Sequence, residues 1–147
     1  MGRILSSKDV EAAVKGGSVF ACGGGGWADH GRELGTLAVT IGRPELVSID
    51  ELPDDAWIAT AAAIGAPGGL TDWQMLGADY VKAAQLVQDA LGEPLAGLII
   101  GQNGMSSTLN AWLPSASAPR WSTRWATSAP IRPATWARSA SHRAPRR

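Results

Sequence analysis

The sequence predicts an α/β domain, a layered sheet with mostly parallel central strands and flanking helices. Three observations lead to this expectation. Apolar runs of strand length alternate with segments of helical periodicity. The run 95–100 is apolar on both faces, as in a strand covered by helices on both sides. The composition then changes abruptly after residue 113. We therefore expect an incomplete α/β domain over residues 1–113 and a disordered tail over 114–147.

The first half of the chain predicts two helices and one strand. A helix is expected to begin at Ser6 or Ser7, because serine hydroxyls cap helices well, and to end at the glycine pair 16–17. Residues 18–22 are then expected to form a short buried strand that ends in four glycines. Residues 32–39 follow as a helix.

The second half predicts strands that alternate with helices, each ended by a turn residue. The strongest helix has apolar side chains at helical spacing and ends at Gly92. The expected elements are a strand over 45–50, an apolar run over 56–64, a helix over 72–91, a strand over 95–100, a turn over 101–104 and a helix from Ser106 or Ser107 through Leu113.

The tail is opposite in charge to the segment before it. Residues 1–113 hold six basic and 13 acidic side chains, a formal charge of −7, whereas residues 114–147 hold seven arginines and no lysine, aspartate or glutamate. Arginine together with three tryptophans is typical of a nucleic-acid-binding tail. The lack of lysine and of any periodic spacing of the arginines argues against nucleic acid as a partner.

A shifted reading frame explains the tail differently. Arginine, alanine, proline, serine and tryptophan are residues that a GC-rich gene yields out of frame. When the third base of each codon is joined to the next two bases from Ala116 onward, permitted codons read LGAPVVDAVGDLRAHPTGDMGSIGLA. One lost nucleotide near Pro114 would have this effect. A true, disordered basic tail is the alternative.

The glycine run is the sharpest local signal for a ligand site. Glycines let backbone amides approach a bound group closely. A tight turn beneath a packed helix is the structural alternative. A dinucleotide-binding, Rossmann-like domain is another, since Gly23, Gly25 and Ala28 have the required spacing and Asp50 ends a later strand, although His30 delays the helix. The candidate binding residues here are Gly23, Gly24, Gly25 and Gly26.

Asp29 and His30 are the candidate catalytic residues. Histidine exchanges protons near neutral pH, and Glu33 shares its face if this segment is helical. A solvated helix start is the alternative. Cys22 is either a nucleophile beside the glycines or a small core residue.

A second group of candidates follows the strand at 95–100. Ligands of α/β proteins bind outside the carboxyl ends of strands, so we expect Gln102, Asn103, Gly104 and Ser106 to contact a substrate. A simple turn followed by a helix cap is the alternative.

The composition also bears on the compartment. No apolar run approaches the roughly 20 residues that span a bilayer, and residues 1–7 lack the apolar core of a secretory signal. Cys22 is the only cysteine, so no intrachain disulfide can form, and a reducing cytoplasm is the expected location. We expect no membrane partner.

Three segments in order resemble the S-methyl thiohydantoin desulfurase family, which is hydantoinase-like and was formerly a domain of unknown function. They are 17–27 (GSVFACGGGGW), 64–67 (IGAP) and 101–114 (GQNGMSSTLNAWLP). Members of this family continue with sequences resembling PVVDA and GRAHPTG, which the shifted reading of the tail also supplies.

The resemblance implies the α/β N-terminal domain of a longer parent, whose second domain is missing. It implies hydrolysis of a five-membered cyclic amide or thioamide as the small-molecule substrate, and an inactive fragment, because the family's later Asp and Arg-Ala-His are not in the translated chain. Asp29 or His30 would handle protons or a metal. Cys22 and Gln102 depart from the family pattern and leave the exact substrate open. A divalent metal and a homo-oligomer in the parent also stay open.

Overall fold

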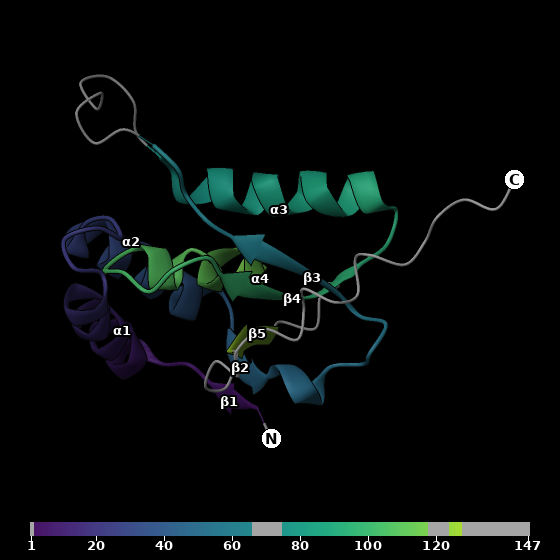
Figure 1. Ribbon diagram of the computed structural model, residues 1–147, viewed down its shortest axis with the longest axis horizontal. Coiled ribbons are helices and arrows are strands. Elements are labelled where there is room, and N and C mark those ends of the chain that lie inside the picture. Colours follow the sequence, from purple (N-terminus) through teal and green to yellow (C-terminus); the bar gives the residue numbers. More distant parts are fainter. Residues whose placement is uncertain (1, 66–74, 118–123, 128–147) are drawn as a thin grey trace, which may run out of the picture.

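A computed structural model describes residues 2–65, 75–117 and 124–127 of the chain. Its centre is a five-stranded sheet in which β1 and β2 pair antiparallel and every other neighbouring pair is parallel (Figure 1). The strands, in sheet order, are β1 (Arg3–Ile4), β2 (Glu45–Ser48), β5 (Arg124–Thr127), β4 (Leu95–Ile100) and β3 (Trp57–Ala61). The predicted α/β fold with mostly parallel central strands is confirmed.

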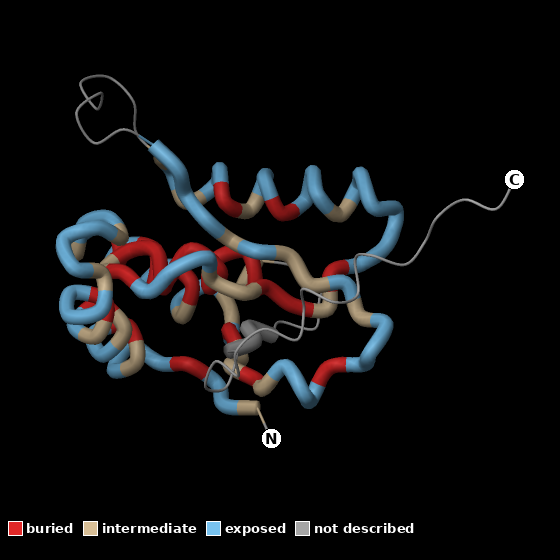
Figure 2. The backbone as a smooth tube through the Cα atoms, viewed as in Figure 1, coloured by how far each residue is buried: buried red, intermediate tan, exposed pale blue. Residues whose placement is uncertain are grey.

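Helices pack around this sheet. The long ones are α1 (Ser7–Phe20), α2 (Ala28–Ile41) and α3 (Gly77–Leu91), and the short ones are the 3₁₀ turns η1 (Ile49–Glu51) and η3 (Ser107–Leu109) and the helix α4 (Trp112–Ser117). Helices α1 and α2 lie side by side at one end, and α3 runs alongside β3 (Figure 1). The buried positions gather where α2, α4 and β4 meet, whereas α3 is exposed along much of its length (Figure 2).

Helix α1 is longer than the sequence predicts. It begins after Ser6, where the Asp9 carboxylate accepts a hydrogen bond from the Ser6 backbone N–H at 2.8 Å. It does not stop at the glycine pair 16–17, and residues 18–20 are its last turn instead of a strand. The predicted stop was wrong because Gly17 has another purpose: a Cβ there would overlap the backbone carbonyl of Gly104. The glycine lets α1 approach the turn after β4.

The predicted helix from Ser106 through Leu113 is also not one helix. The 3₁₀ turn η3 ends at Leu109, and α4 begins at Trp112 and continues to Ser117. The break lies at residues 110–111, both of which are buried. Burial of this segment in the core therefore takes the place of a continuous regular helix.

The remaining elements agree with the sequence more closely. Strand β4 has the predicted bounds and lies between β5 and β3, which confirms it as a central strand. The predicted strand over 45–50 ends at Ser48 and continues as η1. Helix α3 ends as expected at Gly92, which adopts a left-handed φ of 71°. Residues 72–74 of the predicted helix lie outside the described residues.

The buried side chains form two apolar clusters that pack against the sheet. The larger one joins β4 to the helices and has Leu34, Leu109 and Trp112 at its centre, each at most 1 % exposed. A smaller one, around Val47 and Leu52, includes side chains of β3 and β4.

Four residues of the tail belong to the sheet. Strand β5 pairs with β2 over its whole length and contacts β4 at Leu98. The expectation of a tail without regular structure therefore fails for residues 114–117, which form the end of α4, and for residues 124–127, while 118–123 and 128–147 lie outside the described residues. Within the described ranges, no helix combines the length and the apolar character that crossing a membrane requires.

Candidate functional site

The glycine loop and the turn after β4 are in direct contact, as the two predicted groups of binding residues require. The Gly25 carbonyl accepts hydrogen bonds from the backbone N–H groups of Ser106, at 2.9 Å, and Ser107, at 3.2 Å. A Cβ on Gly25 would overlap the Gly104 backbone, and one on Gly26 would overlap the Ser106 hydroxyl. These two segments, 79 or more residues apart in sequence, thus form one junction.

Glycine is needed at this junction for two reasons. Gly25 and Gly26 adopt φ values of 77° and 82°, which favour glycine, and both lie against their neighbours too closely for a side chain. Tight packing therefore accounts for these two positions. Gly23 differs: its φ is 94°, but a Cβ there would meet nothing within 4 Å. Its backbone faces open space, together with the adjacent Gly24, which a ligand could approach.

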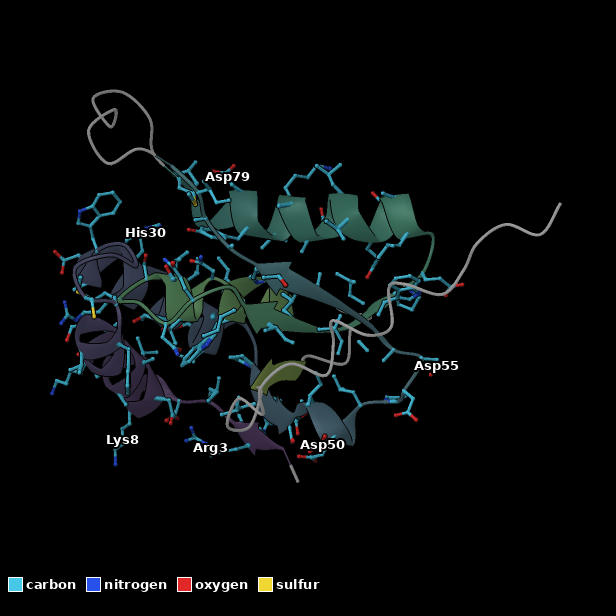
Figure 3. All side chains as sticks on the ribbon, in the orientation of Figure 1. Arg3, Lys8, His30, Asp50, Asp55 and Asp79 are labelled. Atoms are coloured by element: carbon cyan, nitrogen blue, oxygen red, sulfur yellow. The ribbon has the colours of Figure 1, made fainter. Side chains whose placement is uncertain are left out.

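The Rossmann-like alternative does not agree with this geometry. A dinucleotide fingerprint needs a strand before the glycines and a helix that begins inside them. Here helix α1 precedes the glycines and α2 begins at Ala28. Asp50 lies in η1, well away from His30 at the glycine end of the molecule (Figure 3). The spacing of Gly23, Gly25 and Ala28 was a coincidence of sequence.

His30 faces the interior and Asp29 faces solvent. His30 Nε2 and the Tyr80 hydroxyl share a hydrogen bond at 3.3 Å, and the two ring centroids are 6.2 Å apart. The expected neighbour Glu33 places a carboxylate oxygen 3.9 Å from His30 Nδ1. The Asp29 side chain is fully exposed and pairs with Arg32 at 3.1 Å. Of the two candidate catalytic residues, only His30 contacts the body of the domain.

Tyr80 is held in its protonated form. Burial, with a smaller contribution from the charge of Asp79, raises the pKa of Tyr80 to about 12. The hydroxyl is thus neutral over the physiological range and can donate a hydrogen bond to His30 or to a ligand.

The turn after β4 divides into an exposed and a buried part. Gln102 and Asn103 are exposed, and Gln102 Nε2 donates to the Ser107 hydroxyl at 3.0 Å. The Thr108 hydroxyl accepts from the Gly104 N–H at 3.0 Å and donates to the Gly104 carbonyl at 2.8 Å. These bonds hold the turn in place. A simple turn, which was the alternative to a role in binding, therefore also accounts for Gly104 and Thr108. The bonds leave Asn103 free to reach outward.

A cavity of about 100 Å³ lies between α3 and the sheet. Its walls are formed by residues 59–62 at the end of β3, by one face of α3 and by Leu98 of β4. Asn110 and Pro114, which follow η3, complete them. Tyr80 and Asn110 line it, whereas His30 reaches it only through Tyr80. Most other lining side chains are alanine, so the walls of the cavity are largely apolar. No group of three or more potential metal ligands occurs within the described ranges.

The match to a protein family decides what this domain is. The model of the S-Me-THD-like N-terminal domain matches residues 8–120, more than half of the chain. The chain belongs to this family. No curated protein and no solved structure matched the chain. The S-Me-THD-like match ends close to the end of α4 and covers both predicted groups of binding residues.

Sequence reasoning missed two residues of this candidate site, Tyr80 and Asn110. Tyr80 was expected only as one apolar position on a helix, and Asn110 only as part of a motif. A signal for Asn110 was present, since it is a carboxamide inside the apolar stretch 109–113. Asn110 becomes a candidate binding residue only because it lines the cavity, and the sequence does not reveal that cavity.

Proposed function

We propose that this chain is the N-terminal part of a hydrolase that acts on a five-membered cyclic amide or thioamide, and that the 147-residue chain does not turn over such a substrate alone. The match to the model of an N-terminal domain supports the proposal that this chain is part of a longer protein. The observation that supports hydrolytic activity is the hydrogen bond between His30 and Tyr80. It connects a side chain that exchanges protons near neutral pH to the wall of a small apolar cavity.

The roles follow from the positions of the side chains. His30 is the proposed general acid or base, and the neutral Tyr80 hydroxyl orients it. Asp29 remains a second candidate, although its carboxylate pairs with Arg32 at the surface. The open backbone of Gly23 and Gly24, with the exposed Gln102 and Asn103, would contact substrate from the glycine side. The packed glycines Gly25, Gly26 and Gly104 and the buried Ser106 would hold that surface in place.

We also propose that residues 114–147 are translated out of frame and that residues 1–113 are the in-frame part of the domain. The position of β5 supports this. A parallel strand between two others is usually rich in branched apolar residues, yet β5 contains Arg124 and Thr127. The shifted reading supplies the more apolar sequence APVVDAV in the stretch that directly follows α4. Resequencing the gene across codons 110 to 120 tests this directly, and an unchanged frame would reject it.

Activity measurements test the hydrolase. The 147-residue chain and the frame-corrected product should be compared on hydantoin and on an S-methyl thiohydantoin. We expect turnover only from the corrected product, and a loss of about 10²-fold in kcat on His30→Ala, typical of a lost general acid or base. Asp29→Asn is the second variant, and Glu11→Gln, which removes the other partner of Arg32, is the surface control.

Two results would contradict the proposal. Equal turnover by the short chain would show that no missing segment is needed. An unchanged rate in His30→Ala would exclude His30 from the chemistry, and a loss confined to Asp29→Asn would transfer the role to Asp29.

A further inference from the structure

Asn110 is buried without a hydrogen-bond partner for its side chain. It is 1 % exposed, and among the described residues neither its Nδ2 nor its Oδ1 has a partner. Nearby buried hydroxyls are satisfied: Thr108 bonds to the Gly104 backbone, and Ser115 donates to the Ala111 carbonyl at 2.7 Å. The unpartnered carboxamide of Asn110 therefore differs from the hydroxyls of Thr108 and Ser115 on either side of it.

An unpartnered buried carboxamide destabilises a fold. Water would otherwise bond to both its donor and its acceptor, and burial removes those bonds without replacement. A leucine of similar volume would avoid this cost at position 110. Buried polar groups of this kind are rare in native proteins, and one that faces a cavity marks a place where a partner can bind.

The cavity shows where such a partner would bind. Asn110 lines it, and its opposite walls are formed by small side chains such as Ala59, Ala61 and Ala84. A volume of about 100 Å³ exceeds the ~30 Å³ that one water occupies in the liquid. It can therefore accept a small flat group. Tyr80 adds a second hydrogen-bonding group to the wall.

The chemistry of the walls restricts the occupant. Among the described residues that line the cavity there is no lysine, arginine or histidine, so an anion there would meet no compensating charge. The walls therefore favour a neutral group. A carboxamide presents an N–H donor beside a C=O acceptor, and the edge of a cyclic amide or thioamide presents the same pair in the reverse order.

We infer that Asn110 recognises a neutral amide or thioamide edge in this cavity by two antiparallel hydrogen bonds. The inference rests on the proposed function for the class of substrate, and it adds the residue that selects that class. Asn110 contributes binding and orientation, and takes no part in proton transfer. Its hydrogen-bonding groups are left unpaired when the cavity holds no such edge.

Binding to the 147-residue chain itself tests this inference without any requirement for turnover. Calorimetric titration with hydantoin should show binding, and 1,3-dimethylhydantoin, which has the same ring without N–H donors, should bind at least about tenfold more weakly, the effect of one lost hydrogen bond of ~1.4 kcal/mol. This pair of ligands needs no variant. Equal affinity for the two rings would overturn the inference.

Asn110→Leu provides the second test, with Gln85→Leu on the exposed surface of α3 as the matched control. We expect Asn110→Leu to lose hydantoin binding at least about tenfold while its melting temperature stays level or rises, because the unpartnered amide is gone. Gln85→Leu should change neither. A clear fall in the melting temperature of Asn110→Leu would show that the amide is a structural hydrogen-bonding group instead.

The two proposals can fail separately. Hydantoin binding that depends on Asn110, without turnover by the frame-corrected protein, would reject the hydrolase and keep the recognition site. Turnover that survives in Asn110→Leu with unchanged KM would reject the recognition site and keep the hydrolase.

Discussion

The buried segment 104–115 has two neighbours that it meets in different ways. On one side α1, α2 and the glycine loop touch its backbone directly, and Gly25 and Gly31 leave no room for a side chain. On the other side α3 packs closely against Leu113 at its first residue, Gly77, and leaves a cavity beside Asn110. The first side is closely packed, and the second contains space and an unpartnered amide.

This difference between the two sides of segment 104–115 indicates which side supports the fold and which side is available to a ligand. Backbone contact through glycines fixes the position of the segment, since backbone cannot change rotamer to relieve a clash. A cavity costs packing energy that a structural role would not require. We therefore interpret the packed contacts with α1 and α2 as the support that holds Asn110 in place, and the α3 side as the surface on which Asn110 itself meets a ligand.

The largest expected effect comes from filling the tight side. In Gly31→Ala the new Cβ would overlap the Met105 carbonyl oxygen and lie 2.9 Å from its carbon. The backbone must move, so we expect the free energy of unfolding to fall by about 3 kcal/mol. Gly16→Ala is the matched control in α1, where a Cβ meets nothing within 4 Å. There alanine should raise stability by up to about 1 kcal/mol.

Chemical denaturation of both variants measures these effects. Similar stabilities for Gly31→Ala and Gly16→Ala would mean that α2 can withdraw freely, and the contrast between the two sides of the segment would then be lost.

Much of the scaffold could be predicted from the sequence because single-residue patterns determine it. The apolar run at 95–100 identified β4, and the periodicity before Gly92 identified most of α3. Helix α1 was cut short because glycine has two uses: it can end a helix, or it can admit a neighbour as Gly17 does. The choice between them depends on what lies opposite, which is a property of the fold.

The site was predicted less completely for the same reason. The glycine loop and the turn at 102–106 were both predicted to contain binding residues, and the structure brings them into contact. The segment before the glycines is the end of α1 and not the expected strand. Asn110 and Tyr80 become candidate site residues only because both line the cavity between α3 and the sheet. Cavities arise from distances between elements, which no local pattern encodes.

The open side should respond to alkaline pH. The pKa of Tyr80 is raised from an ordinary 10.0 to about 12 by burial. The folded state therefore holds the proton more tightly than the unfolded state, and this contribution to stability is complete below pH 10 and is lost as the pH rises toward 12. Because one pKa unit corresponds to about 1.4 kcal/mol, we expect a loss of at most about 2.7 kcal/mol.

Tyr80→Phe is the control for this pH range. It keeps the ring, removes the ionisation and should abolish that part of the alkaline loss. Because Tyr80 is the only tyrosine, its titration can also be followed by ultraviolet absorbance of the native protein. Tyrosinate that forms at the pKa of an ordinary exposed tyrosine would show that the α3 side is open to water and would end the interpretation of Tyr80 as a buried donor.

The tight side should respond to acid instead, with the smallest effect. A hydrogen bond from the Ser6 hydroxyl, at 2.7 Å, and the neighbouring Arg3 lower the pKa of Asp9, which caps α1. The folded state then favours the carboxylate, so this stability is present above the ordinary pKa of 3.8 and is lost as the pH falls below it. Asp9→Asn should cost about 1 kcal/mol at neutral pH and flatten the acid limb of the stability curve. Asp89→Asn, an exposed change on α3, should leave that limb unchanged. If Asp9→Asn unfolds in acid along the same curve as the unmodified protein, the α1 cap contributes nothing to the rigidity of this side, and the glycine contacts alone must supply it.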